Sequence, residues 1–103
     1  KGFKENEVFK MLGTLRMLCE QASGSYFKGN VTINDKDLHE RLLAEYAKVG
    51  KSVSYEEMMK MLFNLKRKKC IRLECKFVGE DIYHAKEGDT VYTIKLLKNS
   101  MNY

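Results

Sequence analysis

Apolar side chains recur at helical spacing along three stretches of the chain, and each stretch predicts an amphipathic helix. The first stretch covers residues 5–22, and its apolar face consists of Val8, Leu12, Leu15, Cys19 and Ala22. The second begins after Asn34 or Asp35, either of which can cap a helix, and ends at Gly50. Its apolar face consists of Leu38, Leu42, Tyr46 and Val49.

The third stretch begins with Ser54 and Glu57, the spacing at which a side chain and the backbone cap each other at a helix start. It ends in a run of positive charge, residues 66–69, which suits the negative end of a helix dipole. Its apolar face consists of Tyr55, Met58, Leu62 and Leu65.

After Cys70 the apolar spacing changes from helical to alternating, which predicts strands. One strand alternates at Ile71, Leu73, Cys75 and Phe77, and a final strand at Tyr92, Ile94 and Leu96. Between them lies a polar loop, with a short strand expected at Ile82–His84. The β-branched run Val31–Ile33 predicts a short edge strand, with turns at Gly24 and Gly29 before it. We expect a frayed tail from Lys98 on.

The order of these elements predicts an α+β fold of three helices, a short strand and a C-terminal β-hairpin, which is the winged helix-turn-helix arrangement. A length of 103 residues suits a single domain, residues 1–103 with 98–103 as the tail. We expect a core that includes Leu15, Leu42, Leu62, Ile71 and Ile94.

Two passages resemble the winged helix-turn-helix family. Residues 32–38 followed by 53–57 resemble the starts of its two helices, and residues 62–73 resemble its passage from recognition helix into wing strand. The long second helix with Tyr46 and the Ser54-Tyr55 start also resemble the C-terminal winged helix of Cdc6/Orc-type replication initiators. The resemblance implies a third helix in a DNA major groove and a hairpin wing on the adjacent backbone.

Acidic residues depart from that pattern in two places. The start of the third helix, where base contacts are normally made, carries Glu56 and Glu57. The wing loop carries four acidic residues against Lys86: Glu80, Asp81, Glu87 and Asp89. Phosphates would repel both groups, so the resemblance supports the fold more directly than groove reading.

The charge pattern favours an acidic partner. The chain has 19 basic and 14 acidic residues, a net charge of +5, and nucleic acid is the commonest acidic partner. Seven basic residues lie within 17 positions, opposed by Glu74 alone: Lys60, Lys66, Arg67, Lys68, Lys69, Arg72 and Lys76. One interpretation is a phosphate-binding surface, and the other is a solvated helix end followed by a solvated strand edge.

Three further side chains are candidates to face DNA bases: Tyr55, Lys60 and Asn64. Tyr55 also fits the core, which is the favoured interpretation. Met59 and Phe63 lie four positions apart, beside the main apolar face. They form either a patch for a partner or second copy, or the edge of a wide core face, and the core is favoured.

The sequence predicts neither catalysis nor a cofactor. Cys70, Cys75 and His84 lack the paired spacing of zinc sites, Cys19 belongs to a core face, and His39 is expected on the solvated side of its helix. No acid–base set or phosphate-binding glycine loop is present, so we expect no enzyme and no small-molecule substrate. The odd cysteine count favours a reducing intracellular compartment, and neither a membrane-spanning run nor a signal peptide is expected.

Two functional hypotheses follow. The first is a module that binds double-stranded DNA mainly through phosphates, in replication, partition or transcription control. The rival is a winged helix used for protein–protein assembly or dimerisation, for which the acidic wing and the pair Met59 and Phe63 are the arguments.

Overall fold

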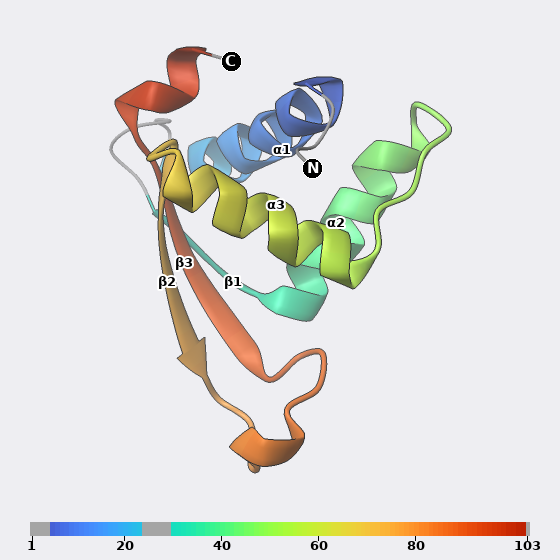
Figure 1. Ribbon diagram of the computed structural model, residues 1–103, viewed down its shortest axis with the longest axis vertical. Helices are drawn as coiled ribbons and strands as arrows, with labels where there is room; N and C mark the ends of the chain where they lie inside the picture. Colours follow the sequence, from blue (N-terminus) through green and yellow to red (C-terminus); the bar gives the residue numbers. More distant parts are fainter. Residues whose placement is uncertain (1–4, 24–29, 103) are drawn as a thin grey trace.

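The computed structural model is an α+β fold that describes residues 5–23 and 30–102 (Figure 1). Its helices are α1 (Glu5–Ser23), α2 (Asp35–Ala47) and α3 (Tyr55–Arg67), and its strands are β1 (Asn30–Asn34), β2 (Ile71–Phe77) and β3 (Thr90–Leu96). Two short 3-10 helices are η1 (Ile82–His84) and η2 (Lys98–Asn102). The three predicted helices and the strands predicted at residues 31–33, 71–77 and 92–96 are confirmed, while the turns expected at Gly24 and Gly29 lie outside the described residues.

The sheet has the strand order β1-β3-β2, with both pairings antiparallel, so β1 is the edge strand that its sequence predicted. Ile94 lies opposite Val31 on one side and opposite Leu73 on the other. All three are buried, because the helices lie against this face of the sheet (Figure 1). The alternate side chains along each strand therefore point away from the helices.

The core joins all three helices to the inner face of the sheet. The five residues expected there, Leu15, Leu42, Leu62, Ile71 and Ile94, are all buried. Val49 was expected on the buried face of the second helix, but it is 57% exposed. The reason is that α2 ends at Ala47 and its last turn is followed by Gly50 with a positive φ of 71°, which turns the chain away from the core.

The starts of α2 and α3 are capped as the sequence predicted. The Asn34 side chain accepts a hydrogen bond from the Lys36 backbone N–H at 2.9 Å. At the start of α3, Ser54 Oγ accepts from the Glu57 N–H at 3.1 Å, and Glu57 Oε1 accepts from the Ser54 N–H at 2.8 Å. These side chains replace water on backbone donors that have no partner within the helix.

Three expectations for the C-terminal part are wrong. Cys75 is exposed and Phe77 only partly buried, because the hairpin extends beyond the helices that would cover them (Figure 1). The expected strand at Ile82–His84 is the 3-10 helix η1. The residues after Lys98 form η2 rather than a frayed tail, and the Arg16 side chain of α1 donates to the Ser100 carbonyl oxygen at 2.7 Å.

Candidate nucleic-acid interface

The face of α3 that points away from the core presents two cations on either side of an aromatic ring. Lys60, Phe63 and Arg67 are all exposed, and their spacing places them along one line of the helix. The buried face consists of Met58, Met61, Leu62 and Leu65. Phe63 is 46% exposed, an unusual position for a large apolar side chain. We call Lys60, Phe63 and Arg67 the outer face of α3.

Two neighbouring side chains do not reach this outer face. Met59 is partly buried against the core, and its Sδ accepts a hydrogen bond from the Tyr92 hydroxyl. The prediction of a wide core face is therefore correct for Met59 and wrong for Phe63. Asn64 is half-buried, and its Oδ1 is enclosed without a hydrogen-bond partner among the described residues. The enclosed Oδ1 is therefore not available to accept a hydrogen bond from a base.

The chain turns sharply from α3 into β2 through four exposed basic residues, 66–69, which we call the basic corner. The Cys70 N–H donates to the Leu65 carbonyl and the Lys69 N–H to the Lys66 carbonyl, both at 3.0 Å. This pair of bonds is the motif in which a helix normally ends with glycine in the left-handed region. Here the left-handed residue is Lys69, with φ of 61°.

The basic residues of β2 lie on a different surface from α3. Leu73 points inward. Because side chains alternate along a strand, Arg72, one position before it, and Lys76, three positions after it, point to the outer face of the sheet. Arg72 pairs directly with Lys95 of β3, and both line a shallow hollow with Glu74. The seven basic residues that are adjacent in sequence are thus divided between α3 with the basic corner and the outer face of the sheet.

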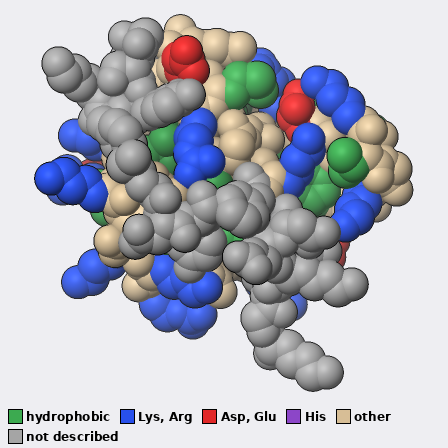
Figure 2. All heavy atoms as spheres, turned by 90° about the horizontal axis from the view of Figure 1, so that it is seen from above, with side chains coloured by type: hydrophobic (Ala, Val, Ile, Leu, Met, Phe, Trp, Pro, Cys, Tyr) green, Lys and Arg blue, Asp and Glu red, His purple; other side chains and the backbone are tan. Residues whose placement is uncertain are grey.

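Six exposed cations of the two surfaces form no ion pair among the described residues. They are Lys60, Lys66, Arg67, Lys69, Arg72 and Lys76. The carboxylate of Glu45, by contrast, lies near both Lys10 and Lys48. Figure 2, seen from the end opposite the hairpin tip, shows prominent Lys and Arg side chains and few Asp or Glu. The positive charge of these surfaces is therefore available to an external anion.

A buried carboxylate, which the sequence analysis missed, connects both helices to the hairpin. Asp35 is fully buried at the start of α2, where its Oδ1 accepts a hydrogen bond from the Gly88 N–H at 2.8 Å. Its Oδ2 accepts from the Tyr55 hydroxyl at the start of α3. The Asn34 amide donates to the Gly88 carbonyl at 2.6 Å, so both backbone groups of Gly88 are held. We call this set the Asp35 junction.

Tyr55, which belongs to the Asp35 junction, has Tyr92 and His39 as neighbours. Burial, and then the hydrogen bond to Asp35, raises the pKa of the Tyr55 hydroxyl, which points into the junction rather than toward solvent. Burial raises the pKa of Tyr92 to about 12. His39 was expected to be solvated, but its Nε2 lies 2.7 Å from the Val53 carbonyl oxygen and its ring meets the Tyr55 ring edge-on.

Gly88 could not be replaced freely at this junction, because its φ is +102°, a conformation that side chains with a Cβ rarely adopt. Nothing near Asp35 in the sequence indicates its burial, since the Gly88 amide that it binds lies 53 positions away. The available signal was Gly88 itself. A glycine before the final strand indicates a tight turn, but it does not indicate that the glycine N–H binds Asp35.

The three cysteines differ in burial. Cys19 is buried as expected, Cys70 is buried and Cys75 is exposed. Among residues 5–23 and 30–102, no three His, Cys, Asp or Glu side chains come together as a metal site would require. No helix in this part of the chain is both long and apolar enough to cross a membrane. Comparisons with protein-family models, curated proteins and solved structures found no match to this chain.

Proposed function

We propose that this chain is a winged-helix domain that binds duplex DNA in replication, partition or transcription control. Two features support the architecture: the element order α1-β1-α2-α3-β2-β3 and the strand order β1-β3-β2 with β3 in the centre. In this proposal α3 lies at the major groove, and the basic corner lies on the phosphates beside it.

The basic corner is the observation that carries the proposal. It places consecutive exposed cations at a helix end, and Lys69 occupies a backbone conformation that glycine would adopt at lower cost. Residues in strained backbone conformations cluster at binding and active sites, so the strain at Lys69 supports a role for its side chain. For a lysine in a run of exposed cations, that role is the neutralisation of phosphate.

The proposed set of DNA-contacting residues is smaller than the set of basic residues adjacent in sequence. The contact consists of Lys60, Lys66, Arg67, Lys68 and Lys69, while Arg72 and Lys76 face the other side of the sheet. Phe63, rather than Asn64 or Tyr55, is the side chain on the outer face of α3 that reaches an apolar base edge such as the thymine methyl. Sequence preference is therefore weak, and phosphate contacts dominate the affinity.

The test is a titration of the chain with unrelated duplexes at several salt concentrations. Affinity should fall steeply with salt, and Arg67→Ala should weaken binding to all duplexes alike while lowering the salt slope by about one unit. Lys69→Gly should weaken binding in the same way yet raise the free energy of unfolding by about 0.5–1 kcal/mol, because glycine relieves the strain.

Two lysines outside the contact serve as matched controls. Lys76→Ala on the outer face of the sheet and Lys51→Ala in the loop between α2 and α3 remove the same charge from exposed positions. Both variants should bind duplexes like the unmodified chain. The proposal is wrong if the unmodified chain fails to bind any duplex at low salt, or if the controls weaken binding as much as Arg67→Ala.

A further inference from the structure

The loop between β2 and β3, residues 78–89, has the opposite charge to the rest of the molecule. Its four acidic residues outweigh Lys86, so its formal charge is −3 in a chain of net charge +5, which leaves +8 on the remaining residues. Figure 1 shows that the loop projects beyond the helices at one end of the molecule. We call residues 78–89 the tip lobe.

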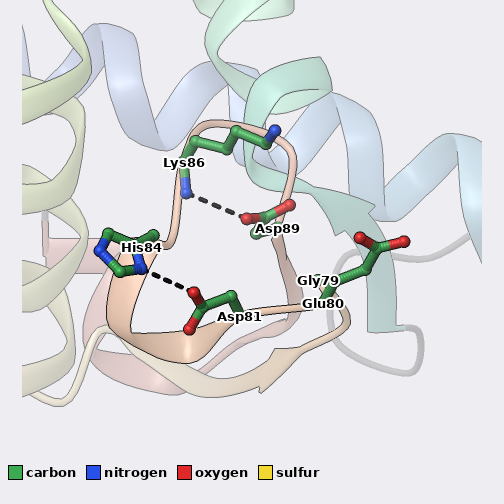
Figure 3. Close-up of a pocket in the computed structure, with 6 residues that line it drawn as sticks. All are labelled: Gly79, Glu80, Asp81, His84, Lys86 and Asp89. Atoms are coloured by element: carbon green, nitrogen blue, oxygen red, sulfur yellow. Dashed lines mark hydrogen bonds and ion pairs between the residues drawn. The ribbon is translucent and has the colours of Figure 1, made fainter.

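Hydrogen bonds hold the tip lobe in one conformation. Asp81 accepts from the Tyr83 N–H at 3.0 Å and lies 2.6 Å from His84 Nδ1, and Asp89 accepts from the Lys86 N–H at 3.0 Å (Figure 3). The Val78 N–H donates to the Asp89 carbonyl at 2.8 Å and closes the base of the lobe. A preorganised loop loses little conformational freedom when a partner binds it.

The tip lobe also exposes apolar side chains. Tyr83 is 90% exposed, Ile82 64% and Val78 52%. Single exposed apolar residues are ordinary, but three within a twelve-residue lobe form the kind of anchor that protein interfaces use. A surface that complements this lobe carries positive charge around an exposed apolar group.

The outer face of α3 has that composition. Phe63 supplies the apolar group, and Lys60 and Arg67 lie one helical turn before and after it. The inner end of the lobe lies beside α2, where Glu87 Oε1 is 3.9 Å from His39 Nδ1. At its outer end η1 projects beyond the helices (Figure 1), so η1 meets α3 only in another molecule. A two-fold arrangement satisfies both lobes at once, because each lobe then lies on the α3 of the other molecule.

We propose that two copies of this chain dimerise by placing the acidic tip lobe of each on the outer face of α3 of the other. Ile82 and Tyr83 contact Phe63 of the second copy, and Glu80 and Glu87 face Lys60 and Arg67. The dimer therefore occupies the face of α3 that the proposed DNA complex uses, so the two forms exclude each other. The contact is small and largely electrostatic, so the dimer is weak and dissociates as salt screens the charges.

The proposal is tested on the whole 103-residue chain, without nucleic acid, by sedimentation velocity at low and high salt. The mass should rise with concentration from 12.0 kDa to twice that value at low salt and remain monomeric at high salt. Tyr83→Ser should shift the dimerisation midpoint to higher concentration at least several-fold. A monomer at every concentration at low salt, or growth beyond the dimer, overturns the proposal.

A pair of charge reversals identifies the surfaces. One variant carries Glu80→Lys and Glu87→Lys, and the other carries Lys60→Glu and Arg67→Glu, all at exposed positions. Neither variant should self-associate, since like charges then meet, whereas their equimolar mixture should form a heterodimer because the lobe and helix charges are again opposite. A mixture that stays monomeric while the unmodified chain dimerises overturns this docking mode.

A third variant separates a local effect from an effect of total charge. Glu20→Lys with Glu40→Lys changes the net charge by the same amount as the reversed lobe, at exposed positions on α1 and α2. This variant should dimerise like the unmodified chain. If it loses dimerisation as completely as the lobe variant, total charge governs association and the proposed contact is wrong.

Discussion

The two ends of the β2–β3 hairpin both carry apolar side chains, but in opposite environments. Near the helices, Leu73 and Ile94 are 4% and 0% exposed, while Val78 and Ile82 at the other end are more than half exposed. Alternation along a strand predicts which side chains share a face, but burial requires a second surface to cover that face. The helices cover only the end near Leu73 and Ile94, where burial stabilises the fold. The other end stays exposed to solvent.

The largest expected effect tests this contrast with two isoleucines. Ile94→Ala should lower the free energy of unfolding by about 3–4 kcal/mol, because it leaves a cavity between the helices and the sheet. Ile82→Ala at the tip deletes the same side-chain atoms from an exposed position. It should change the free energy of unfolding by less than about 0.5 kcal/mol. Urea denaturation of both variants measures the two changes, and equal losses would show that the tip also has a packing partner.

The second prediction concerns the Asp35 junction, which fastens the exposed half to the helices. Asp35→Ala should lower the free energy of unfolding by about 2–3 kcal/mol, because the Gly88 N–H and the Tyr55 hydroxyl lose a charged acceptor inside the protein. Asp37→Ala is the control, since Asp37 lies two residues further along α2 and is exposed. If thermal unfolding finds both variants equally stable, the junction contributes nothing to the stability of the fold.

The smallest effect distinguishes a buried hydroxyl from an exposed one. Burial raises the pKa of Tyr92 to about 12, above the value of about 10 in an unfolded chain. The unfolded state therefore loses its proton first, so this contribution to stability is complete below pH 10 and is lost as the pH rises toward 12. Tyr92→Phe should remove a part of the alkaline destabilisation on the order of 1–2 kcal/mol.

Tyr83→Phe is the matched substitution for this third prediction, because Tyr83 is almost fully exposed at the tip. Stability measured by urea denaturation between pH 8 and pH 11.5 should follow the unmodified chain in Tyr83→Phe and fall less steeply in Tyr92→Phe. An unchanged slope in Tyr92→Phe would show that the Tyr92 hydroxyl does not contribute to the alkaline loss.

Local chemistry explains why most of the fold could be predicted. The spacing of Leu12, Leu42 and Leu62 within their stretches requires helices, and the capping box of Ser54 and Glu57 marks where α3 begins. The exposed positions of Lys60 and Arg67 also follow from this spacing. The separation of Arg72 from these residues follows from strand alternation alone, since it is adjacent to the buried Leu73.

Long-range packing explains the errors. The burial of Asp35 depends on a glycine amide 53 positions away, and the half-buried state of His39 on the loop that carries Val53. Cys75 is exposed because the helices end short of it, a matter of relative lengths that no local pattern contains. The left-handed Lys69 was unexpected for the opposite reason, since a local rule that favours glycine is violated there.

The strand order β1-β3-β2 has a consequence for the way the chain acquires its structure. The central strand is the last of the three in sequence, and among the described residues β1 and β2 each pair with this strand alone. While the chain is being synthesised, β1 therefore has no neighbour until residues 90–96 have left the ribosome, although the helices between them can already form. The β1–β3 pairing, which joins Val31 to Ile94, therefore forms late and from contacts far apart in sequence, which makes folding slower than that of a helical bundle of this size.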